Sequence, residues 1–280
     1  MVFSIGLKPW VKLRAQTFIE YSSESHLAKY SADSPASSSE RSLRILALLA
    51  KEGRALALAE IVSRLDIPKG SAHRLCTQLV DNAFLSRDVD QRFYSVGTAL
   101  RALAFDTLNN GLERGQRHAI LDALVNEVTE TCNFTTLDGA QVLYLDRVEA
   151  NWPLRLHLPI GTHVPLHCTA SGKLFLAMMS KPQRDALLTA LPLPALTKNT
   201  KTRQAALSKE FKLIIERGYS TDEEEFMNGL VAVAVPVLDD SGAMRAAIAV
   251  HAPTARMSIS EAVQKLPALR AAAKKMRQLL

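Results

Sequence analysis

The sequence has no long hydrophobic run, few aromatic residues and no strong excess of charge of either sign. No apolar stretch approaches the roughly 20 residues that a helix needs to cross a bilayer, and the N-terminus lacks the apolar block and small-residue cleavage site of a secretory signal. With 48% hydrophobic and 22% charged residues, the composition is that of a globular protein. These absences predict a cytoplasmic chain with no membrane partner.

Cysteine is scarce as well, at three residues in 280. Cys76, Cys132 and Cys168 are an odd number at irregular spacing, which argues against a disulfide framework and fits a reducing compartment. Cys168 directly follows His167, but neighbours on an extended segment point to opposite sides, whereas a catalytic pair needs contact in space. We therefore predict that the chain is not an enzyme. An enzyme that uses Cys132 or Cys168 as nucleophile stays as an alternative.

No metal site or phosphate loop is predicted. Several residues with metal-binding side chains cluster in sequence, with His251 as a further candidate: His157, His163, His167 and Cys168. No CxxC spacing occurs among them, and the one HxxxH pair, His163 and His167, has no second pair of metal-binding residues at such spacing beside it. Hydrogen-bonded histidines are the favoured interpretation over a zinc site. The segment TASGK, residues 169–173, lacks the spaced glycines of a phosphate loop. It is typical of a turn whose N–H groups open a helix, where a carboxylate can bind. No cofactor is predicted.

The net charge of +6 is spread along the chain. Basic and acidic residues number four and three in residues 1–38, eleven and nine in residues 39–115, and nineteen and sixteen in residues 116–280. Because no segment is strongly basic, a prediction of nucleic-acid binding needs a motif with suitable geometry rather than bulk charge.

Length and pattern divide the chain into parts. A chain of 280 residues is about twice the usual single-domain size, so two domains are expected. Residues 1–38, which run into the serine-rich segment SADSPASSSE, show no sustained period. They are predicted to form a flexible N-terminal extension.

Residues 39–97 begin with the pattern of three helices. Ser37 and Glu40 form a capping box before the first helix, which Gly53 ends. A second helix is predicted over 58–65. Pro68 opens a third helix, whose apolar positions recur at the spacing of one buried face: Ala72, Leu75, Cys76, Leu79 and Val80.

A hairpin signal follows these helices. Two short runs rich in aromatic and β-forming residues, near Phe84 and over 93–96, flank a polar turn at 88–91. Helix, helix, short turn, helix and hairpin is the order of a winged helix-turn-helix, in which the last helix enters the major groove of DNA and the hairpin approaches the backbone. Residues 39–97 are therefore predicted to be a DNA-binding domain.

The polar face of the third helix carries the predicted DNA contacts. Arginine can pair with guanine through two hydrogen bonds, whereas lysine and serine hold phosphate oxygens. Arg87 and Arg92 lie on the two limbs of the hairpin, placed for phosphate contact. A merely solvated helix face is the alternative, and the neighbouring helix and hairpin favour DNA binding. The predicted DNA-binding residues are Lys69, Gly70, Ser71, His73, Arg74, Thr77, Gln78, Arg87 and Arg92.

The second half of the chain predicts an α+β domain. Residues 98–115 are expected to form a linker helix that also meets a partner subunit, and the second domain is expected over 116–280. Its pattern begins with a helix and three strands, NFTTLDG, AQVLYLDRVE and PLRLHLPIG. Helices over SGKLFLAMMS, 182–191 and 202–217 come next, followed by two strands joined by Asp-Ser-Gly and a last helix to Leu280. An antiparallel sheet with flanking helices is the expected architecture.

From about Ser39 onward the chain resembles the IclR family of bacterial transcriptional regulators. The matching segments occur in the family's order: RSLRILALLA, LALAEIVSRLDIPKGSAHRLCTQL, FYSVG, LYLDRVE, PIGTHVPLHCTASGKLFLA, RGYSTDEEE, GLVAVAVPVLDDSG and AAIAVHAP. The resemblance implies an N-terminal winged helix-turn-helix, a linker helix and a C-terminal effector-binding domain related to the GAF fold. It also implies a homodimer or a tetramer built from dimers, which binds double-stranded operator DNA as a repressor or an activator.

The resemblance also places an effector pocket in the second domain. The family's pocket positions correspond here to Trp152, Arg155, Thr169, Ala170, Asp222, Ala232, Ala249 and His251. Regulators that bind very small oxo-acids carry small hydroxyl residues where this sequence has Ala249 and His251. Arg155 and His251 can pair with a carboxylate, and Trp152 with the alanines suits an apolar body. The expected effector is an aromatic or otherwise hydrophobic carboxylic acid. The acidic run 222–225 is otherwise expected to be solvated, with only Asp222 pointing inward.

These expectations describe a one-component switch. Effector binding in the second domain would change the placement of the DNA-binding domains through the linker helix. A rival interpretation is a protein-interaction module, in which the helix-turn-helix binds a protein instead of DNA.

Overall fold

The computed structural model describes residues 37–153 and 158–279, except for the side chains of residues 112 and 113. Residues 1–36 of the expected extension lie outside the described residues. So do Arg155, His157 and the centre of the strand expected over PLRLHLPIG.

Three helices open the described chain: α1 (Ser38–Glu52), α2 (Leu58–Leu65) and α3 (Lys69–Asp81). The Ser37 side chain accepts a hydrogen bond from the backbone N–H of Glu40 and so caps α1. Gly53, in the left-handed region at φ 60°, ends this helix. Both the caps and the three helices confirm the predicted pattern.

A small sheet completes this first unit. Strands β1 (Leu56–Ala57), β2 (Leu85–Arg87) and β3 (Phe93–Val96) pair in the order β1-β3-β2. The predicted hairpin is therefore present as β2 and β3, whereas β1 was not predicted because two residues carry no periodic signal. The stripe of α3 is buried at Ala72, Leu75 and Cys76. It packs with α1 and α2 around Ile45, Leu49 and Ile61.

The linker region divides at a glycine. Helix α4 (Thr98–Asn110) ends at Gly111, and α5 (Leu112–Val128) begins directly after it. The break therefore lies before residue 115, the predicted end of the linker helix. Helix α4 has one described buried residue, Asn109, in agreement with the prediction that it is not a core helix.

The rest of the chain is built on a six-stranded antiparallel sheet in the order β6-β5-β4-β9-β8-β7. Its strands are β4 (Thr131–Asp138), β5 (Gln141–Val148), β6 (His163–Pro165), β7 (Ser220–Glu223), β8 (Leu230–Leu238) and β9 (Met244–Pro253). Strands β4, β5, β8 and β9 were predicted. The short edge strands β6 and β7 were not, because three or four residues show too little alternation.

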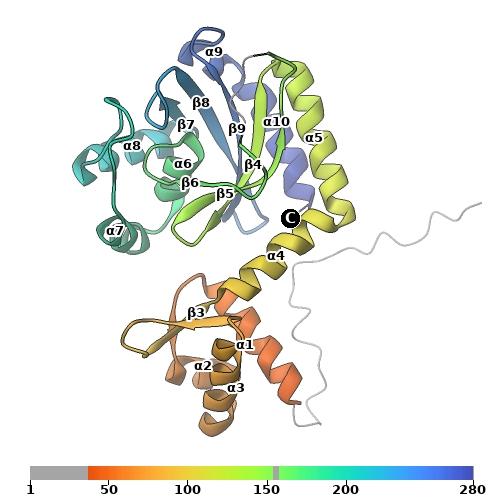
Figure 1. Cartoon of the computed structure of the whole chain (residues 1–280), viewed down its shortest axis with the longest axis vertical. Coiled ribbons are helices and arrows are strands. Elements are labelled where there is room, and N and C mark those ends of the chain that lie inside the picture. The colour runs from red at the N-terminus through yellow and green to blue at the C-terminus, as the bar shows by residue number, and fades with distance from the viewer. Residues whose placement is uncertain (1–36, 154–157, 280) are drawn as a thin grey trace, which may run out of the picture. The chain divides into compact units, whose positions relative to one another are not determined.

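Helices cover both faces of this sheet (Figure 1). Helices α5, α9 (Ile259–Gln264) and α10 (Leu266–Met276) contribute to one core cluster, and a short 3-10 helix (Arg277–Leu279) follows. Helices α6 (Ala170–Met178), α7 (Lys181–Ala190) and α8 (Gln204–Arg217) contribute to the other. The winged helix-turn-helix and this covered antiparallel sheet confirm the predicted α+β architecture.

A β-bulge interrupts the pairing of β4 with β5. Thr135 pairs with Tyr144 and the preceding Phe134 pairs with Asp146, so Leu145 is an extra residue in β5. An extra residue shifts the alternation of side chains beyond it. Asp146 therefore shares the α5 and α10 face with Phe134, and Arg147 shares the opposite face with its partner Asn133.

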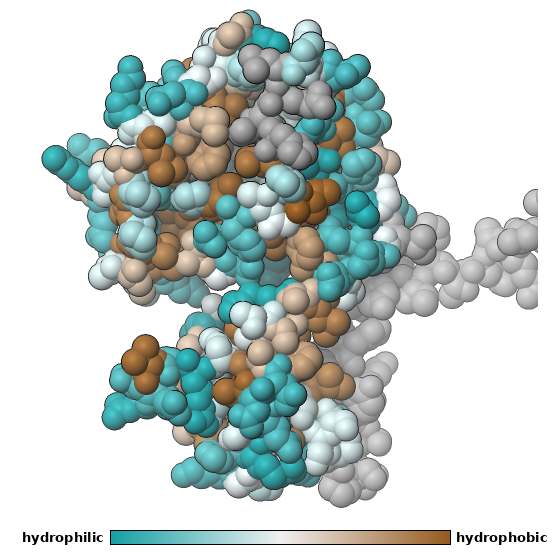
Figure 2. Space-filling model, viewed as in Figure 1, coloured by the Kyte–Doolittle hydropathy of each residue, from teal (hydrophilic) through white to brown (hydrophobic). Residues whose placement is uncertain are grey.

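Exposed apolar side chains are scattered over the described surface. On the face shown in Figure 2, hydrophobic residues are interspersed with hydrophilic ones. Several of the exposed large apolar side chains belong to α4 and to the hairpin, among them Leu103, Leu108, Val89 and Phe93. Within the described part of the chain, no helix combines the length and apolar character that crossing a membrane requires.

Gly97 gives a test of the junction between the hairpin and α4. A Cβ atom at this position would lie 2.1 Å from the backbone oxygen of Ala83. We expect Gly97→Ala to lower the free energy of unfolding by about 1–3 kcal/mol, because the crowding atoms belong to the backbone and cannot rotate away. Urea unfolding followed by circular dichroism measures this.

The matched control is Gly115→Ala, where an added Cβ meets no atom within 4 Å inside helix α5. This change should stabilise the protein by about 0.5–1 kcal/mol. Equal unfolding free energies for the two variants would contradict the analysis of Gly97.

Candidate functional site

Two parts of the structure carry the predicted site residues, and the first is the outer face of α3. Five of the predicted residues on this face are exposed: Lys69, Gly70, His73, Arg74 and Gln78. Ser71 and Thr77 are half-buried. A Cβ at Gly70 would meet no atom within 4 Å, so the protein's own packing does not require a glycine there. The face is therefore open and slim at the start of the helix.

Contacts with α1 hold the polar side chains of this face. Arg74 donates to Gln78 Oε1 at 3.5 Å and to Ser38 Oγ at 3.4 Å. Arg41 donates to Ser71 Oγ at 3.3 Å. Sequence analysis missed Arg41, because nothing in the pattern of α1 shows that its first turns lie beside the start of α3.

The hairpin presents its two arginines differently. The Arg87 guanidinium lies over the Tyr94 ring, 4.7 Å from its centroid, and donates to the Tyr94 hydroxyl and to Gln91 Oε1. Arg92 is exposed. Val89, at the turn between the strands, is fully exposed. Arg92 is thus open to solvent, and Arg87 is held against the neighbouring strand β3.

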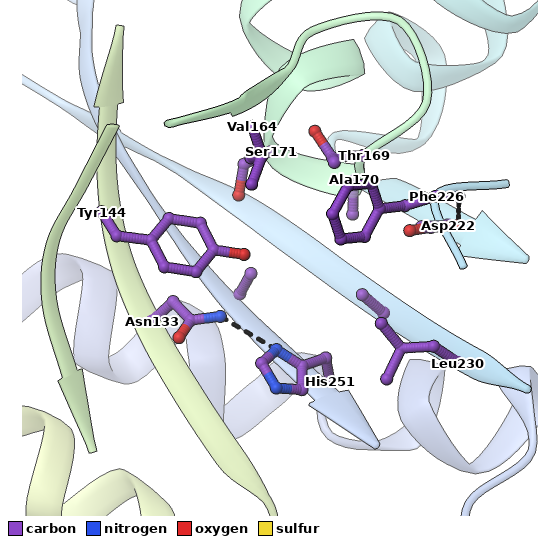
Figure 3. Close-up of a pocket in the computed structure, with 12 residues that line it drawn as sticks. Asn133, Tyr144, Val164, Thr169, Ala170, Ser171, Asp222, Phe226, Leu230 and His251 are labelled. Atoms are coloured by element: carbon purple, nitrogen blue, oxygen red, sulfur yellow. Dashed lines mark hydrogen bonds between the residues drawn. The ribbon is translucent and has the colours of Figure 1, made fainter. Parts of the chain in front are cut away.

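The second part is a cavity on the α6 side of the large sheet (Figure 3). All six strands of the large sheet, the loop after β7 and the first turn of α6 supply its walls. Its empty space, counted out to the mouth, is about 390 Å³, of which about 20 Å³ is open to the centre of a water molecule. The lining residues are Asn133, Tyr144, Val164, Thr169, Ala170, Ser171, Asp222, Phe226, Leu230, Ala232, Ala249 and His251.

The cavity brings together most of the predicted effector-binding residues: Thr169, Ala170, Asp222, Ala232, Ala249 and His251. Trp152 is not among the described lining residues. Its indole N–H donates to the backbone oxygen of Thr129 at 2.9 Å, and Arg256 lies over its ring. The predicted packing of Trp152 against a ligand therefore lacks support from the cavity, and Arg155 lies outside the described residues.

Sequence analysis missed half of the cavity wall. The missed residues come from β4, β5 and β6, from the first turn of α6, from the segment between β7 and β8, and from the start of β8: Asn133, Tyr144, Val164, Ser171, Phe226 and Leu230. Asn133 and Tyr144 lie on the cavity face of strands whose register and bulge are set by tertiary pairing. A pattern of single strands does not contain that information.

The first turn of α6 points its backbone N–H groups at the cavity. Thr169 caps the helix, since its hydroxyl accepts from the Gly172 N–H at 3.1 Å and donates to Pro165 O at 2.7 Å. The N–H groups of Ala170 and Ser171 have no partner within the helix, as at any helix start. This end of α6 is suited to an anion, and the predicted role of the TASGK turn as a helix start is confirmed.

Asp222 faces the same cavity and is 2% exposed. Its Oδ1 accepts from the N–H groups of Glu225 at 2.7 Å and Phe226 at 3.3 Å. Burial raises the pKa of this carboxyl to about 7, although these N–H groups and Lys173 act against the rise. Asp222 therefore takes up or loses a proton near neutral pH.

Behind Asp222 lies a buried ion cluster. Lys173 is fully buried and donates to Glu225, which also accepts from Lys201 at 2.9 Å. The expectation that the acidic run is solvated beyond Asp222 is wrong for Glu225, which is 1% exposed. A single strand cannot reveal such a partner, because Lys173 lies on α6, far away in sequence.

His251 is neutral in this environment. Burial, with the Arg147 cation nearby, lowers the pKa of His251 to about 3. At neutral pH the imidazole therefore offers one N–H donor and one acceptor, so the predicted pairing of His251 with a carboxylate, which stays a prediction, would use a hydrogen bond rather than a positive charge.

The remaining histidine and cysteine candidates do not come together. His163 Nε2 lies 2.8 Å from Asp138 Oδ2, and His167 Nε2 lies 3.0 Å from Pro194 O. No group of three or more metal-binding side chains occurs in residues 37–153 and 158–279. Burial raises the pKa of the Cys168 thiol to about 12 and raises that of Cys132 as well. Both thiols stay protonated at neutral pH, which disfavours their use as nucleophiles.

Comparison with known protein families identifies both halves of the chain. Residues 38–89 match the IclR helix-turn-helix domain. Residues 114–278 match the family described as bacterial transcriptional regulator IclR C-terminal.

Individual proteins agree with these matches. The chain is 43% identical over 236 residues to a probable transcriptional regulator, SauR, of Cupriavidus necator, covering 84% of this chain and 94% of that protein. It is 29% identical over 220 residues to the transcriptional repressor IclR of Escherichia coli, covering 78% and 80%. The crystal structure of the Thermotoga maritima IclR aligns with a TM-score of 0.58 at 25% identity, covering 85% of this chain and 96% of that one.

Asp222 gives a test of the cavity's electrostatics. Because the folded protein holds this proton more tightly than the unfolded chain, Asp222 contributes most to stability below its unfolded pKa of about 4, and this contribution is lost as the pH rises through about 7. Asp222→Asn should remove that loss. The free energy of urea unfolding, measured at about pH 5 and pH 8, should therefore fall less with pH in the variant than in the wild type.

The control is Asp185→Asn, an exposed aspartate on α7 that pairs with Lys181. This variant should follow the pH dependence of the wild type. Parallel pH profiles for Asp222→Asn and the wild type would show that Asp222 does not hold a proton in the folded state.

Proposed function

Since the chain belongs to the IclR family of bacterial transcriptional regulators, we propose that it binds operator DNA through α3 and the β2–β3 hairpin. We propose further that a small organic carboxylate in the α6 cavity changes the affinity for the operator. The observation that carries the proposal is an open polar helix face in one unit together with a buried, anion-suited cavity in the other. The regulator works without a cofactor.

The exposed face of α3 supports the DNA-binding part. Gly70 keeps the first turn of α3 slim, although the packing of the protein does not require a glycine there. A slim first turn is what a helix needs to approach base edges closely. Arg74 is exposed beyond it and is held by Ser38 and Gln78. It is the donor best placed for a guanine or a phosphate, with Lys69 as a phosphate contact.

The symmetry of the operator follows from the oligomer. We propose a homodimer, or a tetramer built from dimers, in which two copies of α3 read half-sites about one helical turn apart or a multiple of it. The operator is then an inverted repeat. The exposed apolar side chains of α4, Leu103 and Leu108, fit a helix that contacts a second copy of the chain.

The composition of the cavity supports a hydrophobic carboxylate as effector. The described wall contains no lysine or arginine, so the carboxylate is held by the free N–H groups at the start of α6 and by the hydroxyl of Ser171, since the Thr169 hydroxyl already donates to Pro165 O. Tyr144, Phe226 and Leu230 add aromatic and aliphatic surface to the wall. An acid with one ring or a short branched chain suits this wall, and the small free volume requires it to displace Phe226 or Tyr144 slightly.

The DNA-binding part is tested with Arg74→Ala. Fluorescence anisotropy of a labelled duplex from the region upstream of the protein's own gene should show binding that weakens steeply with salt. Loss of Arg74 should weaken binding by about 1–3 kcal/mol if it pairs with a base, or lower the salt slope by about one if it contacts a phosphate.

The control for this titration is Arg203→Ala, which removes the same charge from an exposed position before α8. It should bind the operator like the wild type. If neither the upstream duplex nor fragments selected genome-wide bind more tightly than random duplex, the protein is not an operator-binding regulator.

The effector part is tested by isothermal titration calorimetry with benzoate, pyruvate and glyoxylate. We expect benzoate to bind and Gly172→Ala to abolish binding, because a Cβ there would lie 2.4 Å from Leu166 O and displace the first turn of α6. Tight binding of glyoxylate with no binding of benzoate or its substituted forms would refute a hydrophobic effector.

A further inference from the structure

A line of buried polar side chains crosses the large sheet from the cavity to the end of α4. It passes through the bulge in β5, where Asp146 and Arg147 point to opposite faces of the sheet. Each is buried, at 0% and 7% exposed. Two adjacent residues of one strand thus carry polar contacts on both faces.

On the cavity face, three side chains form a closed ring. Arg147 Nη1 donates to Asn133 Oδ1 at 2.9 Å, and Asn133 Nδ2 lies 2.9 Å from His251 Nδ1. Arg147 Nη2 lies 3.4 Å from His251 Nε2, which closes the ring. Asn133 and His251 both line the cavity (Figure 3), so a ligand there touches two of the three members.

This ring cannot satisfy all of its contacts in one arrangement. Arginine only donates, and a neutral histidine has one donor and one acceptor nitrogen. When Asn133 Oδ1 faces Arg147, the Asn133 NH2 group donates to His251 Nδ1. The imidazole proton of His251 then lies on Nε2, where it faces a guanidinium N–H of Arg147. When the Asn133 amide is reversed, its NH2 group faces the guanidinium N–H of Arg147, so these two donors face each other instead. The long 3.4 Å contact is the unmatched one in the structure. The ring therefore has two arrangements, and each leaves one contact in which two donors face each other.

On the opposite face, Asp146 links β5 to α5 and α4. Its Oδ1 accepts from the backbone N–H of Arg147 at 2.8 Å and lies 3.1 Å from His118 Nδ1. Its Oδ2 accepts from Arg117 Nε at 3.3 Å. The other end of Arg117 donates to Leu108 O and Asn109 Oδ1 in the last turn of α4, both at 3.2 Å. Every step from His251 to α4 is thus a described contact.

The last contact in this series is with the buried end of α4. Asn109 is the buried residue of this helix, and its amide also donates to Phe105 O at 2.9 Å. Arg117 is 4% exposed and lies over the Phe134 ring. Because a buried ion pair is costly to break on one side only, Arg117 follows Asp146 when that side chain moves.

We infer that a chain of buried contacts couples the cavity to the C-terminal end of α4. The chain runs from His251 through Asn133, Arg147, Asp146 and Arg117 to Asn109. Through it, the arrangement of the ring determines how well ordered this end of the helix is. As a signal from effector to DNA, this coupling rests on the proposed function, in which α4 connects the DNA-binding unit to the rest of the chain. A ligand that accepts from the ring favours one arrangement, and one that donates favours the other. This supplies the two-state element that coupling between sites requires.

The test uses the full-length protein without ligand or DNA. Asn133→Leu removes the central member of the ring at similar volume. Amide hydrogen exchange in residues 106–110 of α4, followed by mass spectrometry, should become faster by about two- to thirtyfold, the range of coupling along such networks. Asn109→Leu, which removes the contact at α4 itself, should give a similar increase. Asn133→Ser is a milder second variant if Asn133→Leu does not fold.

Thr135→Val is the matched control. Thr135 lies on the same strand and face as Asn133, is fully buried, and donates to Ala247 O at 3.4 Å outside the ring. It should leave exchange in α4 unchanged, whereas a general loss of stability would speed exchange in both variants. Unchanged exchange in the Asn133 variants, alongside faster exchange in Asn109→Leu, would overturn the inference. Because no operator is involved, that result is independent of whether the protein binds DNA.

Discussion

The covering of the large sheet on both faces is the constraint on which the second half of the structure depends. The helices exclude water from most of both faces, so a buried polar side chain in the strands needs a partner inside the protein, at a cost of a few kcal/mol when it has none. Asn133, Arg147 and His251 meet this need on one face, and Asp146 with Arg117 meets it on the other. The bulge at Leu145 decides which charge faces which side, because without the extra residue the alternation of β5 would turn Asp146 toward the cavity and Arg147 toward α5.

The same constraint gives the cavity its chemical character. The cations nearest to it, Lys173 and Arg147, are committed to Glu225 and Asn133 and stand behind the described wall. The wall itself is close to neutral, since burial favours the uncharged forms of Asp222 and His251. The cavity thus offers a ligand the N–H groups at the start of α6 and the proton of Asp222, and its described wall carries no lysine or arginine.

Local signals explain why the first unit was predicted well. A serine cap, a glycine in the left-handed region, a proline at a helix start and a buried stripe on α3 are each properties of a few neighbouring residues. The larger domain was predicted in outline, because β4, β5, β8 and β9 are long enough to show their character. The edge strands β6 and β7 are too short for that. The burial of Glu225 and the outward position of Trp152 depend on partners distant in sequence.

Residue types at short spacing were enough to predict most of the element order, the caps and the apolar stripe of α3, and the family resemblance supplied half of the cavity positions. Only the tertiary structure decided which polar residues meet. The bulge that directs Asp146 and Arg147, the neutral state of His251 and the contact of Arg117 with the end of α4 all arise from pairing and burial. The free energies of these contacts depend on distance in space and on exclusion of water, and neither quantity is encoded by position along the chain.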